Sequence, residues 1–213
     1  MSEVAQRSRE RIARRQVDKF AERRAQLAEA ALQTLAELGY ARTSLRDIAQ
    51  NSAFSHGVLH YYFSDKVDLI TFCVRQCKAE CVTRYDHVVT TAGSAAELQR
   101  GFGAALAATL VQDAPMHRLW YDLRNQSLFD ASFRGDVLEI DQSLEQMIWR
   151  VVARFAELAE APPAVSPGVA YAVFDGLFQQ ALLRQAAGDD GGAAAAILRA
   201  GAEQVLESMI LRR

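Results

Sequence analysis

The chain has 213 residues, half of them hydrophobic and 23% charged, with a formal net charge of -2. No run approaches the roughly 18 unbroken apolar residues of a membrane span, and the arginine-rich N-terminus lacks the apolar stretch of a signal peptide. We therefore expect a cytoplasmic protein with no membrane partner. Residues 1–66 hold 11 Lys and Arg against 8 Asp and Glu, whereas residues 67–213 hold 13 against 18. This asymmetry indicates that the front of the chain is the part that meets a polyanion.

Nearly the whole chain has the pattern of α-helix, because β-branched residues are sparse and no stretch alternates with period two. Residues 1–16 form a basic arm without apolar periodicity. Apolar spacing of three and four residues begins at Val17 and stops before Gly39, which predicts a helix over 17–38. Further helices are expected at about 44–51, 55–61, 65–93, 95–112, 115–129, 131–160, 168–187 and 191–211. The sequence thus predicts an all-α fold.

The segment 43–66 carries the strongest local signal. Ser44 and Asp47 have the spacing of a capping box, and Ser55 is placed to cap a second short helix. Two such short helices, joined by three or four residues, are stable only when they pack on a third, which the helix over 17–38 supplies. The side chains expected to hold the three together are Leu45, Ile48, Leu59 and Phe63. The pattern predicts a helix-turn-helix with its second short helix in the DNA major groove.

The residues of this segment also resemble a known family, the tetracycline-repressor-like (TetR) regulators, over about residues 23–69. The resemblance implies a helix-turn-helix DNA-binding domain at 17–65, after the arm at 1–16, and a larger helical ligand-binding and dimerisation domain at 66–213. A weaker likeness to choline-responsive members covers residues 116–150. The matching residues are Leu38-Gly39-Tyr40, Thr43-Ser44-Leu45-Arg46-Asp47-Ile48-Ala49, Ser55-His56-Gly57-Val58-Leu59-His60-Tyr61-Tyr62-Phe63 and Lys66-Val67-Asp68-Leu69.

Two positions depart from the family's usual pattern. Ala53 stands in the turn where such regulators usually carry glycine, which predicts a positive φ and a cost of about 1 kcal/mol. The usual Tyr-His pair is inverted as His60-Tyr61, which weakens any inference about the preferred bases.

By position, the resemblance implies that Arg46 reads a base, because its guanidinium suits the O6 and N7 edge of guanine. Ser55 belongs to the same DNA-binding set. The residues expected at the floor or walls of the groove are His56, Gly57, Val58, His60 and Tyr61. The expected phosphate contacts are Thr43, Ser44, Tyr62 and Lys66. A core position is the alternative for Tyr62, and a solvated tail is the alternative for the arm.

The larger domain offers candidate residues for an effector site. Arg124 lies within the apolar segment 119–129, where a charge needs a partner or a ligand. His117, just after Pro115, is interpreted as a capping or solvent-facing residue. Core packing is the alternative for the apolar candidates. The full set is Phe72, Phe102, Trp120, Tyr121, Arg124, Leu128, Met147 and Trp149.

Three cysteines, Cys73, Cys77 and Cys81, recur every fourth residue along one helical stripe. Neighbouring thiols can bind a soft metal or respond to an oxidant. Three thiols on one helix converge poorly on one ion, and cysteine is a common buried residue, so core packing is the preferred interpretation.

The two C-terminal helices carry abundant apolar residues, Leu206 among them, which predicts a homodimer through this pair. We expect a repressor that binds a palindromic double-stranded DNA operator and is released by a small, largely apolar or aromatic effector. No metal-binding signature, phosphate-binding glycine loop or nucleophile elbow occurs, so we expect neither an enzyme nor a cofactor. The alternatives are a helical enzyme or binding protein, and a DNA-binding redox or soft-metal sensor acting through the cysteines.

Overall fold

The computed structural model describes residues 3–39, 43–188 and 191–211, and these residues form ten α-helices. Within these ranges the only β-type pairing is an isolated antiparallel bridge between Pro163 and Ile210. The all-α prediction is therefore confirmed. None of the helices in the described ranges is long and apolar enough to cross a membrane. The chain divides into two compact units, Met1–Val74 and Arg75–Arg213.

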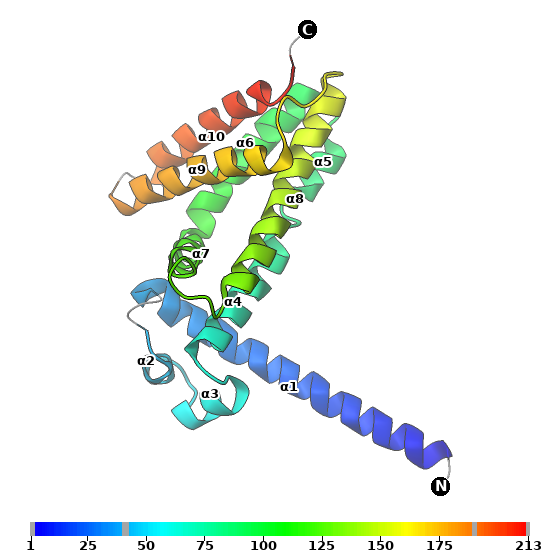
Figure 1. Ribbon diagram of the computed structural model, residues 1–213, viewed down its shortest axis with the longest axis vertical. Coiled ribbons are helices and arrows are strands. Elements are labelled where there is room, and N and C mark those ends of the chain that lie inside the picture. The colour runs from blue at the N-terminus through cyan, green and yellow to red at the C-terminus, as the bar shows by residue number, and fades with distance from the viewer. Residues whose placement is uncertain (1–2, 40–42, 189–190, 212–213) are drawn as a thin grey trace. The chain divides into compact units, whose positions relative to one another are not determined.

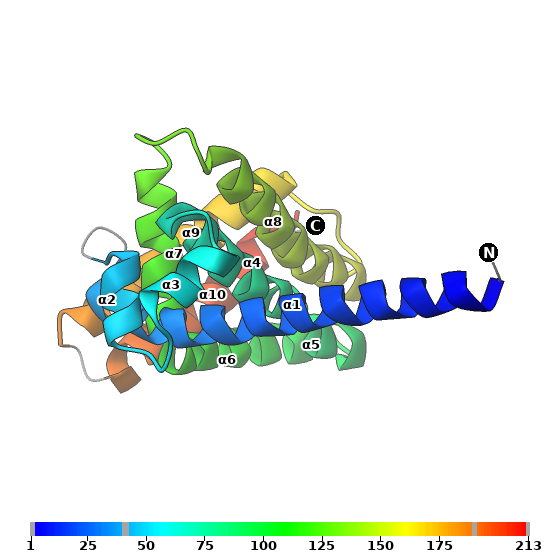
Figure 2. The ribbon, with the colours of Figure 1, turned by 90° about the horizontal axis from the view of Figure 1, so that it is seen from below.

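The first unit contains α1 (Glu3–Leu38), α2 (Leu45–Gln50), α3 (His56–Tyr62) and the beginning of α4 (Lys66–Cys81). Helices α2 and α3 contact each other, and α2 packs on α1, as Figure 2 shows. The four side chains predicted to join these helices are buried, which confirms their core role; they are Leu45, Ile48, Leu59 and Phe63.

Two boundaries in this unit differ from the predictions. Helix α1 begins at Glu3, so the arm and the supporting helix are one element. Arginine, glutamate and alanine are good helix formers, and a polar helix shows no apolar stripe to reveal it. Gly39 ends α1 as expected, with φ 78° and its N–H bonded to the Leu35 carbonyl at 2.8 Å.

The units divide after Val74, nine residues beyond the predicted boundary at 65. The reason lies in α4, whose first turns belong to the first unit. The Cys73 thiol donates to the Ala28 carbonyl of α1 at 3.3 Å, and Leu69 and Ile70 are fully buried.

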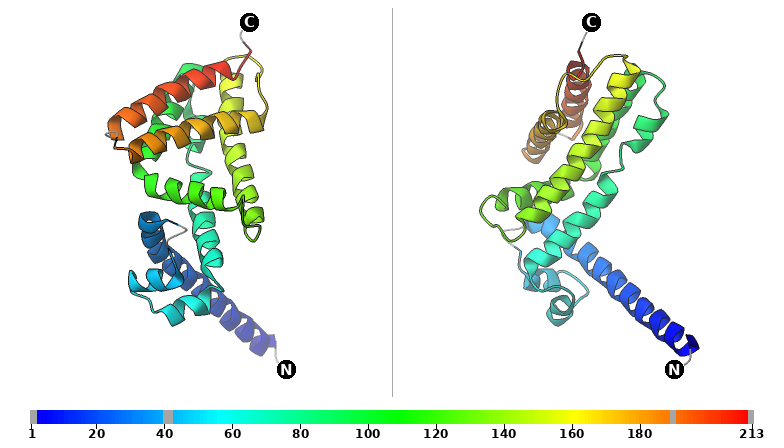
Figure 3. Two further views of the ribbon diagram at one scale, coloured as in Figure 1. Left: turned by 60° about the vertical axis from the view of Figure 1, so that its left-hand side comes forward. Right: turned by 45° about the vertical axis from the view of Figure 1, so that its right-hand side comes forward.

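The second unit contains the end of α4, then α5 (Asp86–Thr91), α6 (Ala95–Gln112), α7 (Ala114–Gln126), α8 (Arg134–Leu158), α9 (Pro167–Ala186) and α10 (Gly191–Ser208). Helices α9 and α10 run side by side, α10 packs along α6, and α9 crosses α8 (Figures 1 and 3). Gly103 permits the close approach of α6 to α10, because a Cβ there would lie 3.2 Å from the Arg199 carbonyl oxygen. The loop before α9 is joined to the chain after α10 by two backbone hydrogen bonds, from Ala164 to Met209 and from Leu211 to Pro162.

The long helix expected over 65–93 is two helices instead. Helix α4 ends at Cys81, a turn follows, and α5 begins at Asp86. Arg84 in this turn forms an ion pair with Asp113 and donates a hydrogen bond to the Thr109 hydroxyl at 3.1 Å. These interactions with the end of α6 stabilise the turn, and the helical periodicity of the sequence did not reveal them.

Candidate DNA-binding surface and effector pocket

The short helices α2 and α3 are both capped at their N-termini. The Ser44 hydroxyl accepts from the Asp47 N–H at 3.2 Å, and the Asp47 carboxylate accepts from the Ser44 N–H at 2.8 Å, which confirms the capping box. Hydrogen bonds from the Ser44 side chain and then its backbone lower the pKa of Asp47. Ser55 caps α3 by accepting from the Val58 N–H at 3.3 Å.

The turn between the helices is less strained than predicted. Among the residues that the structure describes, Glu160 is the only non-glycine residue with a positive φ. Ala53 therefore adopts an ordinary backbone conformation, and the expected cost of a non-glycine residue there was wrong.

Most predicted DNA-binding side chains lie on the exposed surface of α2 and α3. Tyr61 is the most prominent, with 73% of its surface exposed. The rings of His56 and His60, one helical turn apart on α3, lie 4.4 Å from each other. The exposed members of the set are Ser44, Arg46, Ser55, His56, Gly57, His60 and Tyr61, and Val58, Tyr62 and Lys66 are half-buried.

Thr43 differs from the rest of this set, because its side chain is buried. Only 2% of its surface is exposed, and its hydroxyl donates to the Gly39 carbonyl at 2.7 Å. This hydroxyl supports the loop after α1 and does not face solvent as the predicted phosphate contact requires.

Aromatic packing fixes α3 against α1. The Tyr62 ring lies 4.7 Å from Phe20 of α1, and the Tyr61 ring lies 6.2 Å from the same residue. Tyr62 therefore contributes to packing whether or not it also contacts phosphate.

Arg24 of α1 forms a second aromatic cluster in the first unit. Its guanidinium lies 4.7 Å from the Phe63 ring and 4.6 Å from the Phe72 ring, and it pairs with Asp68. Phe72, predicted as an effector contact, instead belongs to this cluster and lines none of the cavities described in the second unit.

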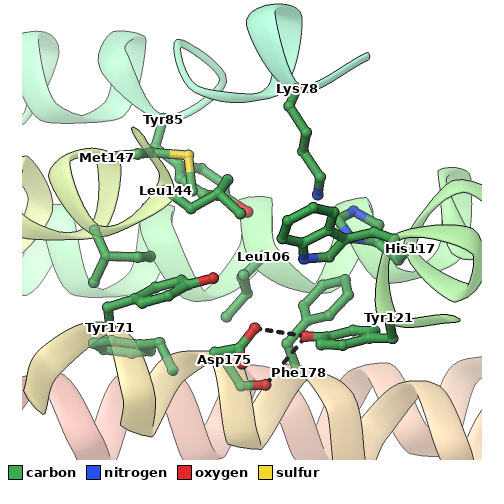
Figure 4. Close-up of a pocket in the computed structure, with 13 residues that line it drawn as sticks. Lys78, Tyr85, Leu106, His117, Tyr121, Leu144, Met147, Tyr171, Asp175 and Phe178 are labelled. Carbon is green, nitrogen blue, oxygen red and sulfur yellow. Dashed lines mark hydrogen bonds between the residues drawn. The ribbon is translucent and has the colours of Figure 1, made fainter. Parts of the chain in front are cut away.

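The second unit contains a cavity of about 60 Å³. Figure 4 shows side chains from α4 at one side and from α9 at the opposite side, with α7 and α8 contributing between them. The lining residues are mostly aromatic and aliphatic: Lys78, Tyr85, Leu106, His117, Trp120, Tyr121, Leu144, Met147, Ile148, Tyr171, Phe174, Asp175 and Phe178.

A network of charges and hydroxyls closes the α9 side of the cavity. Arg124 lies between two carboxylates, 3.2 Å from Asp141 and 2.5 Å from Asp175. The Tyr121 hydroxyl donates to Asp175 at 2.9 Å, and the Tyr171 hydroxyl donates to Asp141 at 2.6 Å. Burial, followed by the charge of Asp175, raises the pKa of both tyrosines. Both hydroxyls therefore stay protonated, and Arg124 has the partners that its apolar surroundings require.

The α4 side of the cavity is different in character. Lys78 is only 6% exposed, and its ammonium lies 5.2 Å from the centre of the Trp120 ring. Figure 4 shows this ammonium beside His117, whose ring packs 4.5 Å from Phe178. Burial, and then the charge of Lys78, lower the pKa of His117 to about 2, so the imidazole is neutral. Its predicted role as a capping or solvent-facing residue was wrong.

Three of the eight predicted effector residues line the cavity, namely Trp120, Tyr121 and Met147. Arg124 lies behind it in the ionic network, and Phe102 is buried 5.3 Å from Phe174. Leu128 does not line this cavity, because it follows the end of α7 and is 71% exposed. Trp149 is half-buried and lines none of the described cavities.

Sequence reasoning missed the contribution of α9. Tyr171, Phe174, Asp175 and Phe178 recur at a spacing of three and four residues, which places them on one face of the helix. An acidic residue within an aromatic face was the available signal. The apolar residues of α9 are equally consistent with a dimer interface, so this signal alone does not identify a cavity.

Among the side chains that the structure describes, nothing supports a metal or redox sensor built on the cysteines. Cys73 is buried and bonded to Ala28, Cys81 is half-buried near Arg84, and the side chain of Cys77 lies outside the described part of the structure. No group of three His, Cys, Asp or Glu side chains suited to a metal ion occurs among the described residues.

Comparisons with known proteins agree with this architecture. Residues 27–71 match the family model for bacterial regulatory proteins, tetR family. The HTH-type transcriptional regulator BetI of Burkholderia cenocepacia (strain HI2424) is 29% identical over 163 residues, which cover 76% of this chain and 82% of BetI.

Two solved structures share the fold at low sequence identity. A transcriptional regulator from Saccharomonospora viridis, solved in complex with choline, superposes with a TM-score of 0.73 and 18% identity. The match covers 91% of this chain and 100% of the other. The transcriptional regulator FadR from Bacillus subtilis in complex with stearoyl-CoA has a TM-score of 0.67 and 17% identity, covering 87% of this chain and 97% of the other.

Proposed function

Because the chain belongs to the TetR family of transcriptional regulators, we propose that it is a repressor that binds a palindromic DNA operator as a homodimer and is released by a small effector. The observation that carries this proposal is the pairing of two features. The first unit presents a capped, exposed α3, and the second unit contains an aromatic cavity. A ligand-responsive repressor needs at least a DNA-binding element and a ligand-binding site in the same chain.

In this proposal α3 enters the major groove and Arg46 of α2 reads a base. Arg46 is exposed, and the capping box fixes the first turn of its helix. Ser44, Tyr62 and Lys66 lie at or near helix ends, where side chains contact phosphates and set the register of the protein on DNA.

The DNA site can be selected from a random pool and then used to test Arg46. We expect Arg46→Ala to weaken binding to the selected site by about 1–3 kcal/mol and to leave binding to random DNA nearly unchanged. Arg100→Ala removes an exposed arginine from α6 of the second unit and serves as the control. Equal losses on selected and random DNA for Arg46→Ala would show that it does not read a base.

Dimerisation is proposed to use the exposed face of α9 and α10. Val169 and Val173 of α9 and Ile197 of α10 are 50%, 38% and 51% exposed, so they offer apolar surface that a second protomer could cover. Leu206, which sequence reasoning placed at the interface, is completely buried within the protomer. A charge at Leu206 would disrupt the core of the unit and would not test the interface.

Ile197→Glu tests the interface without disturbing the core. An isologous interface repeats each substitution, so two carboxylates are brought together and the dimer is expected to dissociate. Leu138→Glu on α8, at a residue that is 62% exposed, is the matched control and should leave the dimer intact. Light scattering coupled to size exclusion measures the outcome, and a dimeric Ile197→Glu protein would place the interface elsewhere.

The cavity of the second unit is the proposed effector site. An effector that binds one conformation more tightly shifts the population towards it, and DNA is released if that conformation binds the operator less well. The cavity of about 60 Å³ favours a compact molecule with an apolar or aromatic body.

A further inference from the structure

The charged and polar groups that line the cavity indicate which class of effector it can bind. This inference rests on the proposed function, in which the cavity is the effector site. The polar groups on the α9 side are already engaged with one another. Asp175 accepts from Tyr121 and from Arg124, and the Tyr171 hydroxyl donates to Asp141. A ligand that relied on the Asp175 carboxylate would have to compete with these two donors.

The α4 side of the cavity has unused hydrogen-bonding capacity. Trp120 is 1% exposed, and its indole Nε1 is buried with no hydrogen-bond partner in the structure. The Nε2 atom of His117 is likewise buried without a partner. An indole N–H can only donate, and a neutral imidazole can donate from Nε2. A buried donor without an acceptor is costly, so these groups are suited to oxygen atoms of a ligand.

The charge on this side has the sign that such a ligand needs. The Lys78 ammonium lies over the Trp120 ring and beside His117, inside a largely apolar surrounding. Lys78 makes further interactions of its own, and what it adds to the cavity is positive charge. That charge attracts an anion, and it repels a cation that enters the same space.

We propose that the cavity takes a compact carboxylate with an apolar body, whose oxygens accept hydrogen bonds from Trp120 Nε1 and His117 Nε2 beside the Lys78 ammonium. The apolar body packs against Phe174 and Phe178 of α9 and Ile148 of α8. A cavity needs at least about 10–15 Å³ to hold one water, so a cavity of about 60 Å³ has room for a small ligand before side chains move.

Three probes of similar size and different charge test this assignment on the full chain. Isobutyrate carries the carboxylate, isobutylammonium carries the opposite charge, and isobutanol is neutral. Calorimetric titration at one pH and ionic strength gives the three affinities. We expect isobutyrate to bind at least about tenfold more tightly than either of the others. Absent binding of isobutyrate at tens of millimolar, or equal or tighter binding of isobutylammonium, would overturn the proposal.

Variants assign the binding to the named groups. Lys78→Met keeps an unbranched side chain, one atom shorter, and removes its charge, and Trp120→Phe keeps an aromatic ring and removes the N–H. Each should weaken isobutyrate binding about tenfold. Arg118→Met removes an exposed charge from the residue that follows His117 and should change nothing. Unchanged isobutyrate affinity in both test variants, each shown by circular dichroism to be folded, contradicts the proposal.

The test also separates this proposal from the proposed function. Isobutyrate that binds through Lys78 and Trp120 without releasing the selected operator supports the carboxylate site and removes its regulatory role. A cationic or neutral compound that releases the operator from this cavity, while isobutyrate does not bind, preserves ligand-responsive repression and overturns the carboxylate site.

Discussion

Arg124 joins three helices, and its removal should be costly. Its side chain is 32% exposed, and those of its partners Asp141 and Asp175 are 20% and 14% exposed. Exposed ion pairs contribute about 0–1 kcal/mol, whereas breaking a fully buried pair costs about 3–5 kcal/mol. Because the burial is intermediate and two carboxylates lose their cationic partner, we expect Arg124→Met to lower the free energy of unfolding by about 2–3 kcal/mol. This corresponds to a decrease in Tm of about 5–10 °C for a chain of this size.

Urea denaturation followed by circular dichroism measures this cost. Arg199→Met is the matched control, because Arg199 is 50% exposed and pairs with Glu203 one turn along α10. Its loss should cost no more than about 0.5 kcal/mol. Adding Asp175→Asn to Arg124→Met should recover part of the stability by removing one stranded charge. If Arg124→Met lies within about 0.5 kcal/mol of the unaltered protein, the network behaves as a surface pair and the reasoning is refuted.

Three further predictions concern stability. Burial lowers the pKa of His117 from 6.5 to about 2, so the stability from the neutral imidazole is present above pH 6.5 and is lost as the pH falls towards 2. In urea denaturation, His117→Gln should reduce the slope of the free energy of unfolding against pH, between about pH 6.5 and 4.5, by more than about 1 kcal/mol per pH unit. A curve parallel to that of the unaltered protein would contradict this. Glu160 has a φ of 50°, so Glu160→Gly should stabilise the chain by about 1 kcal/mol in a thermal melt, and a lower Tm would oppose the idea. Ser55→Ala should lower the stability of α3 by about 1 kcal/mol and so accelerate hydrogen exchange in this helix, whereas the control Ser55→Thr keeps the cap. Equal exchange in both variants would exclude a role for the cap.

The helix-turn-helix was readable from the sequence because its signals are local. The caps of α2 and α3 lie within three residues of the groups they bind, and the core residues Leu45 and Ile48 have helical spacing. Local features also mark the start of α9 at Pro167, one residue before the predicted start at 168, and the end of α1 at Leu38, just before Gly39.

The cavity was only partly predictable, because it depends on which helix faces meet. An aromatic residue in a helical pattern is equally consistent with a core, a cavity or a surface. Trp120 and Leu128 lie two turns apart in one apolar segment, yet one is 1% and the other 71% exposed, because α7 ends between them. The position of Lys78 could not be predicted, since nothing in its neighbourhood in the sequence indicates that a lysine of α4 is buried beside Trp120.

The hydrogen bonds that join residues 162–164 to residues 209–211 have a practical consequence for building reporters from this protein. The end of the second unit is held by backbone contacts, with Leu211 donating to Pro162 at 3.0 Å and Ala164 donating to Met209 at 2.7 Å. A shortened version that stops at Ser208 loses both contacts and frees the segment leading into α9. A fluorescent domain is therefore best attached beyond Leu211 through a flexible linker, so that its motion does not strain these two hydrogen bonds.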